Sequence, residues 1–201
     1  MHKFSISLAL AAWLFSTVVC ADQELRRGSL LVATGDVFGP IFAESVILLL
    51  HYDEFGAMGL VVNRPLGTKP ADALPGIQAL AEYDGTLYWG GPVQQYALRA
   101  LLRTDIVPGH ALPVFSSVYL VPPTAELLAR ASSPERLRFY VGYAGWAAGQ
   151  LDAEIARGSW QVLPASEQAV FAEKPGELWK KLSPPREYRA AAHSGLASRM
   201  P

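Results

Sequence analysis

The sequence predicts a single compact domain of the α+β class, with a mixed, mainly antiparallel, barrel-like β-sheet flanked by helices. Short apolar runs recur between glycine, proline and aspartate residues, a pattern typical of strands and turns. The 201 residues include 17 glycines and 15 prolines, which favours short elements over long helices or a coiled coil. Because 51% of the residues are hydrophobic and only 17% are charged, the chain can bury a core and is not a disordered protein.

Three apolar runs predict the first strands. Residues 28–33 form a short run that ends at the turn-forming sequence Thr34-Gly35-Asp36. Residues 45–51 are largely apolar but too few for a typical helix, which predicts a central strand covered on both faces. Residues 57–63 predict a third strand, and the short connection at 53–56 predicts a tight antiparallel hairpin with the second.

The middle of the chain predicts short strands and two helices. Leu74, Ile77 and Leu80 recur every three residues, which predicts a short helix behind a loop within 66–84. Residues 125–131 predict a second helix, capped by Thr124. Further strands are predicted where apolar runs alternate with glycine, proline or aspartate, at 87–89, 97–102 and 118–121.

The C-terminal third predicts a strand and a helix that meet at Gly145-Trp146. The strand covers 137–143, where aromatic residues alternate, and the helix covers 147–157 and stops at Gly158. Two late strands at 160–163 and 170–171 and a final helix at 175–182 complete the predicted domain. Residues 183–201 are rich in proline, alanine and arginine, which predicts a disordered tail.

The N-terminus predicts an export signal at 1–21. A short basic start, His2-Lys3, precedes a mostly apolar stretch at 4–15, and Val19-Cys20-Ala21 offers modest side chains where a signal peptidase cleaves. Cleavage after Ala21 leaves a domain at 22–182 and places the protein in the periplasm or outside the cell, with no stable membrane insertion. An uncleaved membrane anchor and a misplaced start codon are the alternatives.

The single cysteine, Cys20, lies where the cysteine of a lipoprotein signal would lie. The preceding Thr17-Val18-Val19 argues against lipidation, because a bulky valine occupies the position before Cys20 where a small residue is usual. We therefore expect cleavage after Ala21. The mature chain then has no cysteine, which excludes disulfides, thiolate nucleophiles and cysteine metal sites.

The charge balance excludes nucleic acid as a partner. Removing 1–21 takes Lys3 from the 17 basic residues and leaves the 18 acidic residues unchanged, so the mature formal charge is −2. Binding of DNA or RNA depends on neutralising phosphates with clustered lysine and arginine, which this composition does not favour.

Several motifs follow one another over most of the mature chain, and in this order they resemble the YqgE/AlgH family across 27–182. They are Gly56-Ala57-Met58-Gly59-Leu60-Val61-Val62-Asn63-Arg64-Pro65, Gly90-Gly91-Pro92-Val93, Gly142-Tyr143-Ala144-Gly145-Trp146, Gly149-Gln150-Leu151, Glu154 and Gly158-Ser159-Trp160. The resemblance implies a compact α+β domain around a mixed sheet, in a family described as uncharacterised or as transcriptional regulators. Family members generally begin at the first strand and look cytoplasmic, whereas an export signal precedes Arg27 here. An exported protein cannot contact the chromosome.

Two glycine- and arginine-containing motifs are candidates for ligand contact. The backbone amides of Gly90 and Gly91 could bind an anion, but no helix and no Lys-Ser/Thr pair follows, so a tight turn that needs positive φ is favoured. Arg64, after Asn63, could bind a carboxylate or phosphate through its guanidinium, or be buried against Glu154 or a carbonyl oxygen.

The densest motif is Gly145-Trp146 followed by Gln150 and Glu154. Small residues beside an aromatic ring and an amide could read a ligand, although a packed strand-to-helix corner explains the same pattern. Glu154 could be a general base or a salt-bridge partner. His51 is the only histidine within the predicted core, and no His-x-x-x-His or Gly-x-Ser-x-Gly spacing accompanies it, so no metal site or catalytic triad is predicted.

These observations favour a non-enzymatic binding or interaction domain in the periplasm, without a cofactor or metal, whose partner is a small ligand or an envelope protein. The expected ligand or partner surface is Asn63, Arg64, Gly90, Gly91, Gly145, Trp146, Gln150 and Glu154. Two alternatives remain open. One is a hydrolase or isomerase that uses Glu154 or His51 as base. The other is a cytoplasmic transcriptional regulator, which requires that the export signal does not function.

Overall fold

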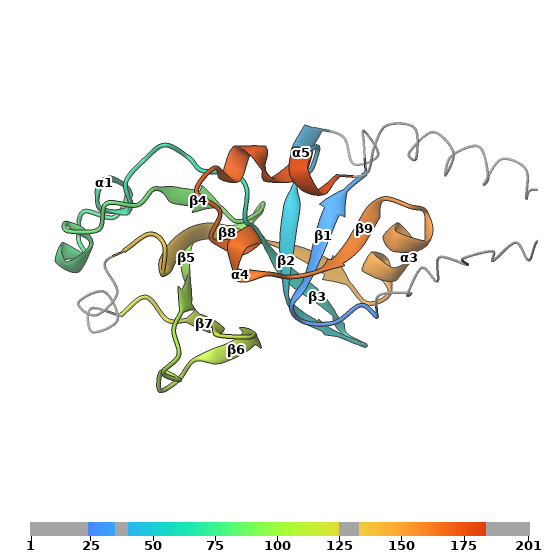
Figure 1. Cartoon of the computed structure of the whole chain (residues 1–201), viewed down its shortest axis with the longest axis horizontal. Helices are drawn as coiled ribbons and strands as arrows, with labels where there is room; N and C mark the ends of the chain where they lie inside the picture. Colours follow the sequence, from blue (N-terminus) through green and yellow to red (C-terminus); the bar gives the residue numbers. More distant parts are fainter. Residues whose placement is uncertain (1–23, 35–39, 125–132, 184–201) are drawn as a thin grey trace, which may run out of the picture.

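The computed structural model describes residues 24–34, 40–124 and 133–183 (Figure 1). Within them, nine strands form one curled, mainly antiparallel sheet, a half-barrel with a few short helices, as predicted. The predicted signal peptide at 1–21, the helix at 125–131 and the tail beyond Ser183 lie outside the described residues. None of the helices in the described part of the chain has the length and apolar character needed to cross a membrane.

The strands run in the order β6-β7-β5-β8-β3-β2-β1-β9, and β4 pairs in parallel with β8 while every other pair is antiparallel. The strands are β1 (Ser29–Ala33), β2 (Val46–Asp53), β3 (Gly56–Val61), β4 (Leu87–Trp89), β5 (Val93–Arg103), β6 (Leu112–Phe115), β7 (Val118–Val121), β8 (Leu137–Ala147) and β9 (Trp160–Pro164). The helices are α1 (Pro70–Ala73), α3 (Gln150–Ala156), α4 (Glu167–Val170) and α5 (Leu178–Leu182), with 3₁₀ turns η2 (Gln78–Leu80) and η3 (Pro175–Glu177).

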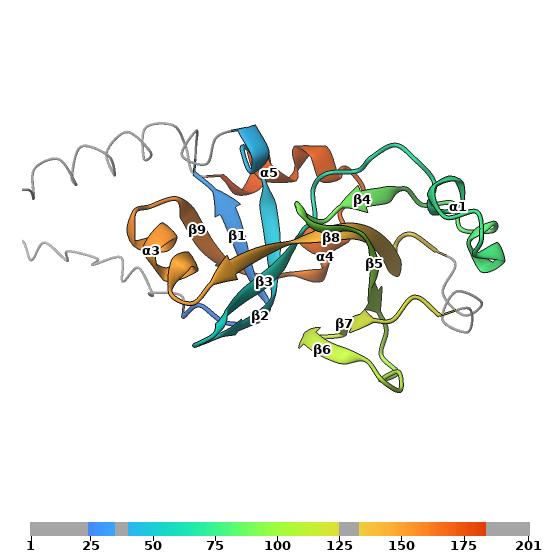
Figure 2. The same cartoon turned by 180° about the vertical axis from the view of Figure 1, so that it is seen from behind.

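The central strands β1 and β2 carry apolar side chains on both faces of the sheet, which explains their continuous apolar runs. Leu30 and Leu48 belong to one buried cluster, which is covered by Val170 of α4, the following Phe171, and Leu178 of α5. Leu31 and Ile47 belong to a second cluster, which α3 covers with Leu151. Successive strand residues point to opposite faces, so helices must shield the sheet on both sides (Figure 2).

The predicted hairpin between the second and third strands is confirmed. Asp53 pairs with Gly56, and Glu54-Phe55 form the turn between β2 and β3. The single helix predicted within 66–84 is wrong, because Pro75-Gly76 separate α1 from η2. Even so, Leu80 is buried and Leu74 and Ile77 pack against the same apolar cluster, so their spacing did identify an inward face.

Two predictions in the C-terminal third are wrong. The strand predicted at 137–143 continues to Ala147, so Gly145-Trp146 lie inside β8 and the corner falls at Gly149, which starts α3 with φ +70°. Residues 170–171 are not a strand, because Ser166 caps α4 by accepting a hydrogen bond from the Ala169 amide.

Strand β6 was not predicted from the sequence. Its Pro113 weakens the sequence signal for a strand and is tolerated because β6 lies at the edge of the sheet.

Three glycines allow β8 to cross the β4–β5 connection at backbone contact. The Gly90 amide donates to the Val141 carbonyl of β8 at 2.8 Å, and the Val61 amide of β3 donates to the Gly90 carbonyl at 2.9 Å. A Cβ on Gly91 would overlap the backbone of Tyr143, and one on Gly142, where φ is +71°, would overlap the Gly91 carbonyl oxygen. The predicted positive φ is found at Gly91, where φ is +151°, but Gly90-Gly91 form an extended crossing segment and not the predicted tight turn.

Replacing Gly142 by alanine is expected to reduce the free energy of unfolding by about 3 kcal/mol or more, since the variant combines an unfavourable φ with a backbone overlap. Urea unfolding followed by circular dichroism measures the loss. Gly109→Ala is the control, because a Cβ there meets open space and the expected change stays within about 0.5 kcal/mol. Equal effects of the two substitutions would contradict the crossing as a constraint.

Candidate functional site

Glu154 lies at the centre of a buried hydrogen-bond network on the face of the sheet covered by α3. Its Oε2 accepts hydrogen bonds from the indole nitrogens of Trp146 and Trp160, both at 2.8 Å, and its Oε1 accepts one from Gln150 Nε2 at 3.0 Å. The residue is 9% exposed. The donors are neutral, so within the described residues Glu154 is held by hydrogen bonds and not by the expected salt bridge, and it joins β8, α3 and β9.

Gln150 extends this network to the start of α3. Its Oε1 accepts a hydrogen bond from the Ala147 amide at 3.1 Å, and its amide nitrogen is the Glu154 donor. Gly145 lies in β8 opposite Met58 of β3. The predicted group of Gly145, Trp146, Gln150 and Glu154 is therefore brought together, with its polar side-chain atoms committed to each other.

Asn63 and Arg64 hold the segment before β2 against the end of β3. Asn63 accepts from the Val46 amide at 2.8 Å and donates to the Glu44 carbonyl at 2.9 Å. The Arg64 guanidinium donates to the carbonyls of Ile41 at 2.5 Å and Ala43 at 2.7 Å. These contacts match the structural interpretation in which Arg64 is tied to carbonyl oxygens.

Arg64 also packs against an aromatic row. Its guanidinium carbon lies 5.0 Å from the ring centroid of Trp89. Partial burial lowers the pKa of Arg64 from its ordinary value, and the charge of Glu44 opposes that shift. The guanidinium stays cationic because an arginine titrates far above neutral pH.

Phe42 connects the two groups of predicted residues. Its ring centroid lies 6.2 Å from those of Trp89 and Trp160, and Trp160 lies 6.2 Å from Trp146. The row Trp89-Phe42-Trp160-Trp146 therefore runs from Arg64 to Glu154. No sequence pattern indicates Phe42, because its role depends on contacts with strands that are distant in the chain.

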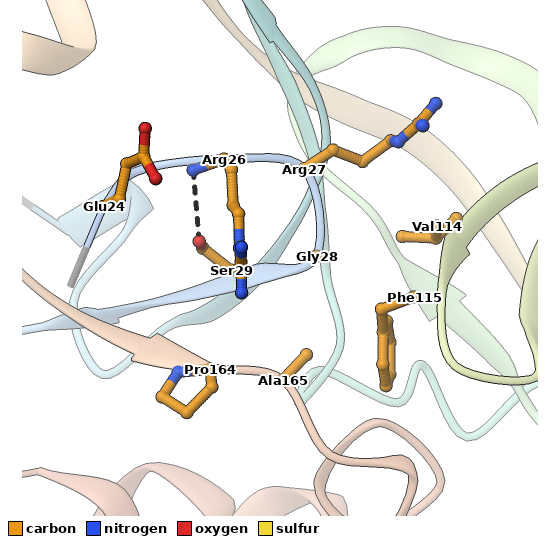
Figure 3. A pocket seen from close by; sticks show the side chains of 9 residues that line it. All are labelled: Glu24, Arg26, Arg27, Gly28, Ser29, Val114, Phe115, Pro164 and Ala165. Atoms are coloured by element: carbon orange, nitrogen blue, oxygen red, sulfur yellow. Dashed lines mark hydrogen bonds between the residues drawn. The ribbon is translucent and has the colours of Figure 1, made fainter.

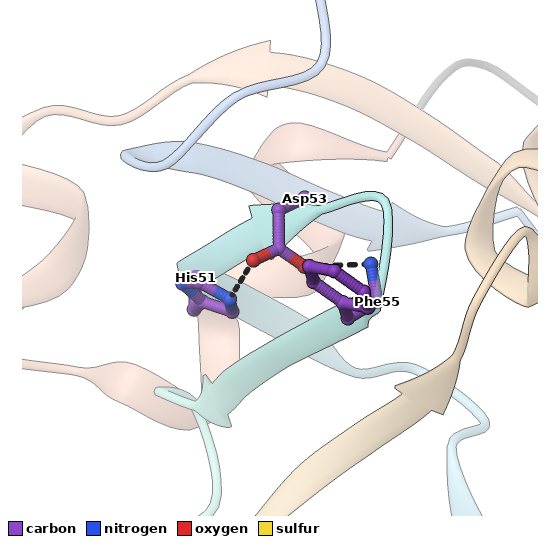
Figure 4. A network of polar contacts seen from close by, with 3 residues as sticks. All are labelled: His51, Asp53 and Phe55. Atoms are coloured by element: carbon purple, nitrogen blue, oxygen red, sulfur yellow. Dashed lines mark hydrogen bonds and ion pairs between the residues drawn. The ribbon is translucent and has the colours of Figure 1, made fainter.

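The prediction that His51 belongs to the core is wrong. Its side chain is 58% exposed, and its Nε2 lies 2.8 Å from Asp53 Oδ2 at the end of the β2–β3 hairpin (Figure 4). Asp53 Oδ1 accepts a hydrogen bond from the Phe55 amide at 2.9 Å. A register shift between Leu49 and His51 coincides with the point where β2 leaves the core, which the apolar run alone does not reveal.

A cavity of about 590 Å³ lies beside the start of β1 (Figure 3), and it was not predicted from the sequence. Its lining comes from three separate parts of the chain: Glu24, Arg26, Arg27, Gly28 and Ser29 before and in β1, Val114 and Phe115 of β6, and Pro164 and Ala165 at the end of β9. Consecutive arginines ahead of the first strand were the one available sequence signal.

Gly28 allows the cavity walls to meet. With φ +83°, it donates to the Leu49 carbonyl at 2.8 Å and accepts from the Ala165 amide at 3.0 Å. A Cβ at Gly28 would lie 2.9 Å from the Cβ of Phe115, so the backbone of the β1 segment and β6 approach closely only because this residue is glycine. The Ser29 hydroxyl accepts a hydrogen bond from the Arg26 amide at 3.3 Å.

Glu167 fixes the β6–β7 hairpin, which supplies one wall of the cavity. Its Oε1 accepts hydrogen bonds from the hydroxyls of Ser116 at 2.8 Å and Ser117 at 2.6 Å, and from the Ser117 amide at 3.4 Å. These hydrogen bonds, that of Ser117 foremost, lower the pKa of Glu167 below its ordinary value of 4.5. Within the described residues, no group of three histidine, cysteine or acidic side chains could hold a metal ion.

Comparison with known proteins confirms the resemblance carried by the glycine-rich motifs. The family model described as AlgH-like (DUF179) matches residues 30–184. A UPF0301 protein from Nocardia farcinica is 37% identical over 164 residues, which cover 79% of this chain and 76% of the relative. A UPF0301 protein from Methylococcus capsulatus is 37% identical over 175 residues, covering 84% of this chain and 91% of the relative.

Two solved structures resemble the fold. A crystal structure of a Corynebacterium diphtheriae protein has a TM-score of 0.67 and 25% identity, and the match covers 79% of this chain and 86% of that one. The solution structure of the AlgH protein from Pseudomonas aeruginosa has a TM-score of 0.59 and 28% identity, covering 87% and 94% respectively.

Glu154→Ala is expected to lower the free energy of unfolding by about 3 kcal/mol, because it leaves two buried indole donors and the Gln150 amide without their acceptor. Glu154→Gln should lose less, since its carbonyl oxygen still accepts. Chemical unfolding followed by tryptophan fluorescence measures both losses. Glu173→Ala, at an exposed position, is the control. A loss below about 1 kcal/mol for Glu154→Ala would rule out this structural role.

Glu167 should make stability depend on pH in the acidic range. Because its folded-state pKa lies below the unfolded value, the stabilisation is present above the unfolded pKa and is lost as pH falls through the folded pKa. We expect Glu167→Gln to unfold more easily than the parent protein at pH 7 and equally easily once both carry a neutral side chain. Thermal unfolding between pH 7 and 3 tests this, with Glu173→Gln as control. A difference that is constant across that range would contradict it.

Proposed function

This chain belongs to the AlgH-like family, and we propose that it serves as a non-enzymatic binding domain in the periplasm. The proposal that the domain is non-enzymatic rests on the network around Glu154, which is the strongest acid–base candidate in the sequence. Both of its carboxylate oxygens already accept hydrogen bonds inside the fold. A general base needs an oxygen within reach of a substrate proton, so this geometry favours a structural role.

The same reasoning applies to the other polar members of the predicted surface. Asn63 and Arg64 bond backbone carbonyl and amide groups of the segment before β2, and Gln150 bonds Ala147 and Glu154. The cavity beside β1 offers a more open place for a ligand, because its arginines are exposed. A binding function therefore has a candidate site that does not require the buried network to come apart.

Export is supported by the N-terminal sequence. The basic His2-Lys3 start, the apolar stretch at 4–15 and the cleavage position after Ala21 together have the organisation of a secretory signal. The mature formal charge of −2, from 16 basic and 18 acidic residues once Lys3 is removed, supports a partner other than nucleic acid. A transcriptional regulator, as the family is described, must be cytoplasmic, so cell fractionation separates export from gene regulation.

Fractionation of the native host cell should place the protein in the soluble periplasmic fraction with Asp22 as its first residue. Intact mass and N-terminal sequencing of each fraction check this. A membrane-bound chain that begins at a lipidated Cys20 would contradict the proposed cleavage site. An unprocessed cytoplasmic chain would overturn export and make gene regulation a candidate function again.

A substrate screen tests the proposal that the domain is not an enzyme. A broad substrate screen with the purified protein should show no turnover that depends on Glu154. Turnover that follows a pH profile and is lost in Glu154→Gln, while the variant remains folded by circular dichroism, would replace the binding function by catalysis. Parallel assay of Glu173→Gln controls for effects of removing an acidic residue from the surface.

A further inference from the structure

We propose that the cavity beside β1 binds a compact organic anion through Arg26 and Arg27. The inference deepens the proposed binding function and rests on it. Both arginines lie in the segment just before β1, and Figure 3 shows their side chains leaving it in different directions, Arg26 beside Ser29 and Arg27 away from Ser29. Neither forms an ion pair with another residue of the described chain. Two such guanidinium groups at one cavity suit a carboxylate or a phosphate ester, whose oxygens accept in the planar geometry arginine offers.

The opposite wall supplies apolar surface. Val114 and Phe115 of β6 face the cavity from one side, and Pro164 and Ala165 close it from below in the view of Figure 3. The volume of about 590 Å³ falls within the range of about 300 to 1,000 Å³ typical of small-molecule sites. A ligand with an anionic group and one apolar ring or short chain matches both walls.

The cavity lies where the curled sheet fails to close. Strands β6 and β9 are the two ends of the strand order, and residues from both line the cavity. No ladder joins these edges, so the gap is a consequence of the topology. The Glu167 hydrogen bonds to Ser116 and Ser117 hold β6 in place, and Gly28 touches Phe115, so the walls are braced before any ligand arrives.

Among the described residues of the lining, only Glu24 is acidic, and it opposes anion binding. Because the two arginines outnumber this one carboxylate, the lining is net positive and favours an anionic ligand over a neutral one. It also provides an internal test, because removing a negative charge should strengthen the same interaction that removing the arginines weakens.

Isothermal titration calorimetry at low ionic strength can test the proposal with phenyl phosphate, benzoate and benzyl alcohol as probes. At least one of the two anions should bind at least about tenfold more tightly than the neutral alcohol, and Arg26→Gln/Arg27→Gln should weaken that binding about tenfold or more, as expected for charge-assisted hydrogen bonds. Glu24→Gln should tighten it. The ratio of phenyl phosphate to benzoate affinity identifies the anionic group, and either preference supports the site.

Arg157→Gln is the matched control, because it removes an exposed arginine at the end of α3, away from the cavity, and should leave affinity unchanged. Equal binding of benzyl alcohol, or unchanged anion binding in the folded double variant, would overturn the proposal. Absence of anion binding by a protein found in the periplasm would refute this site while leaving export intact. Conversely, a cytoplasmic chain that binds the anions would refute export and leave the site standing.

Discussion

The close crossing of Gly90 and Gly91 with Gly142 is the constraint on which the rest of this fold depends. β8 has β5 along one side, but along the other it pairs first with β4 and then with β3. Gly90 donates a hydrogen bond to β8 through its amide and accepts one from β3 through its carbonyl oxygen. It therefore lies at the point where the neighbour of β8 changes from β4 to β3. Side chains at these positions would force the backbones apart, so the curl that leaves β6 and β9 as separate edges depends on their absence.

Within that frame, the Glu154 network stabilises the face that α3 covers. Burying a carboxylate is costly unless hydrogen bonds satisfy it, and here three donors from two strands and a helix supply that compensation. An apolar core would tolerate small shifts of α3 against the sheet. A carboxylate that must meet two indole nitrogens at once fixes α3, β8 and β9 in a single arrangement, so this buried polar group contributes to the specificity of the structure as well as to its stability.

How much the sequence predicts depends on whether a feature is local. The continuous apolar runs of β1 and β2 and the short β2–β3 turn are encoded within a few residues, and the prediction of these strands was correct. Pro113 masked an edge strand, and apolar Val170-Phe171 follow a serine cap that outweighs their strand propensity. Partners present a harder case, since Arg64 bonds carbonyls some 20 residues away and Glu167 accepts from Ser117, which is 50 residues away. The cavity joins three distant segments, so the consecutive arginines before β1 indicate only one part of its lining.

The distribution of polar groups separates structural from functional chemistry in this domain. The motif residues that suggested a ligand surface turn their donors and acceptors inward, toward Glu154 and toward the segment before β2. A ligand competing for them would have to break hydrogen bonds that are buried at Asn63 and Trp146 and partly buried at Arg64 and Gln150, at a cost of about 1 to 3 kcal/mol for each buried group left unsatisfied. The guanidinium groups of Arg26 and Arg27 have no such buried hydrogen bonds to break, because both side chains are exposed to solvent. Their interaction with an anion competes only with solvent, so the cavity beside β1 is the place where binding disturbs the fold least.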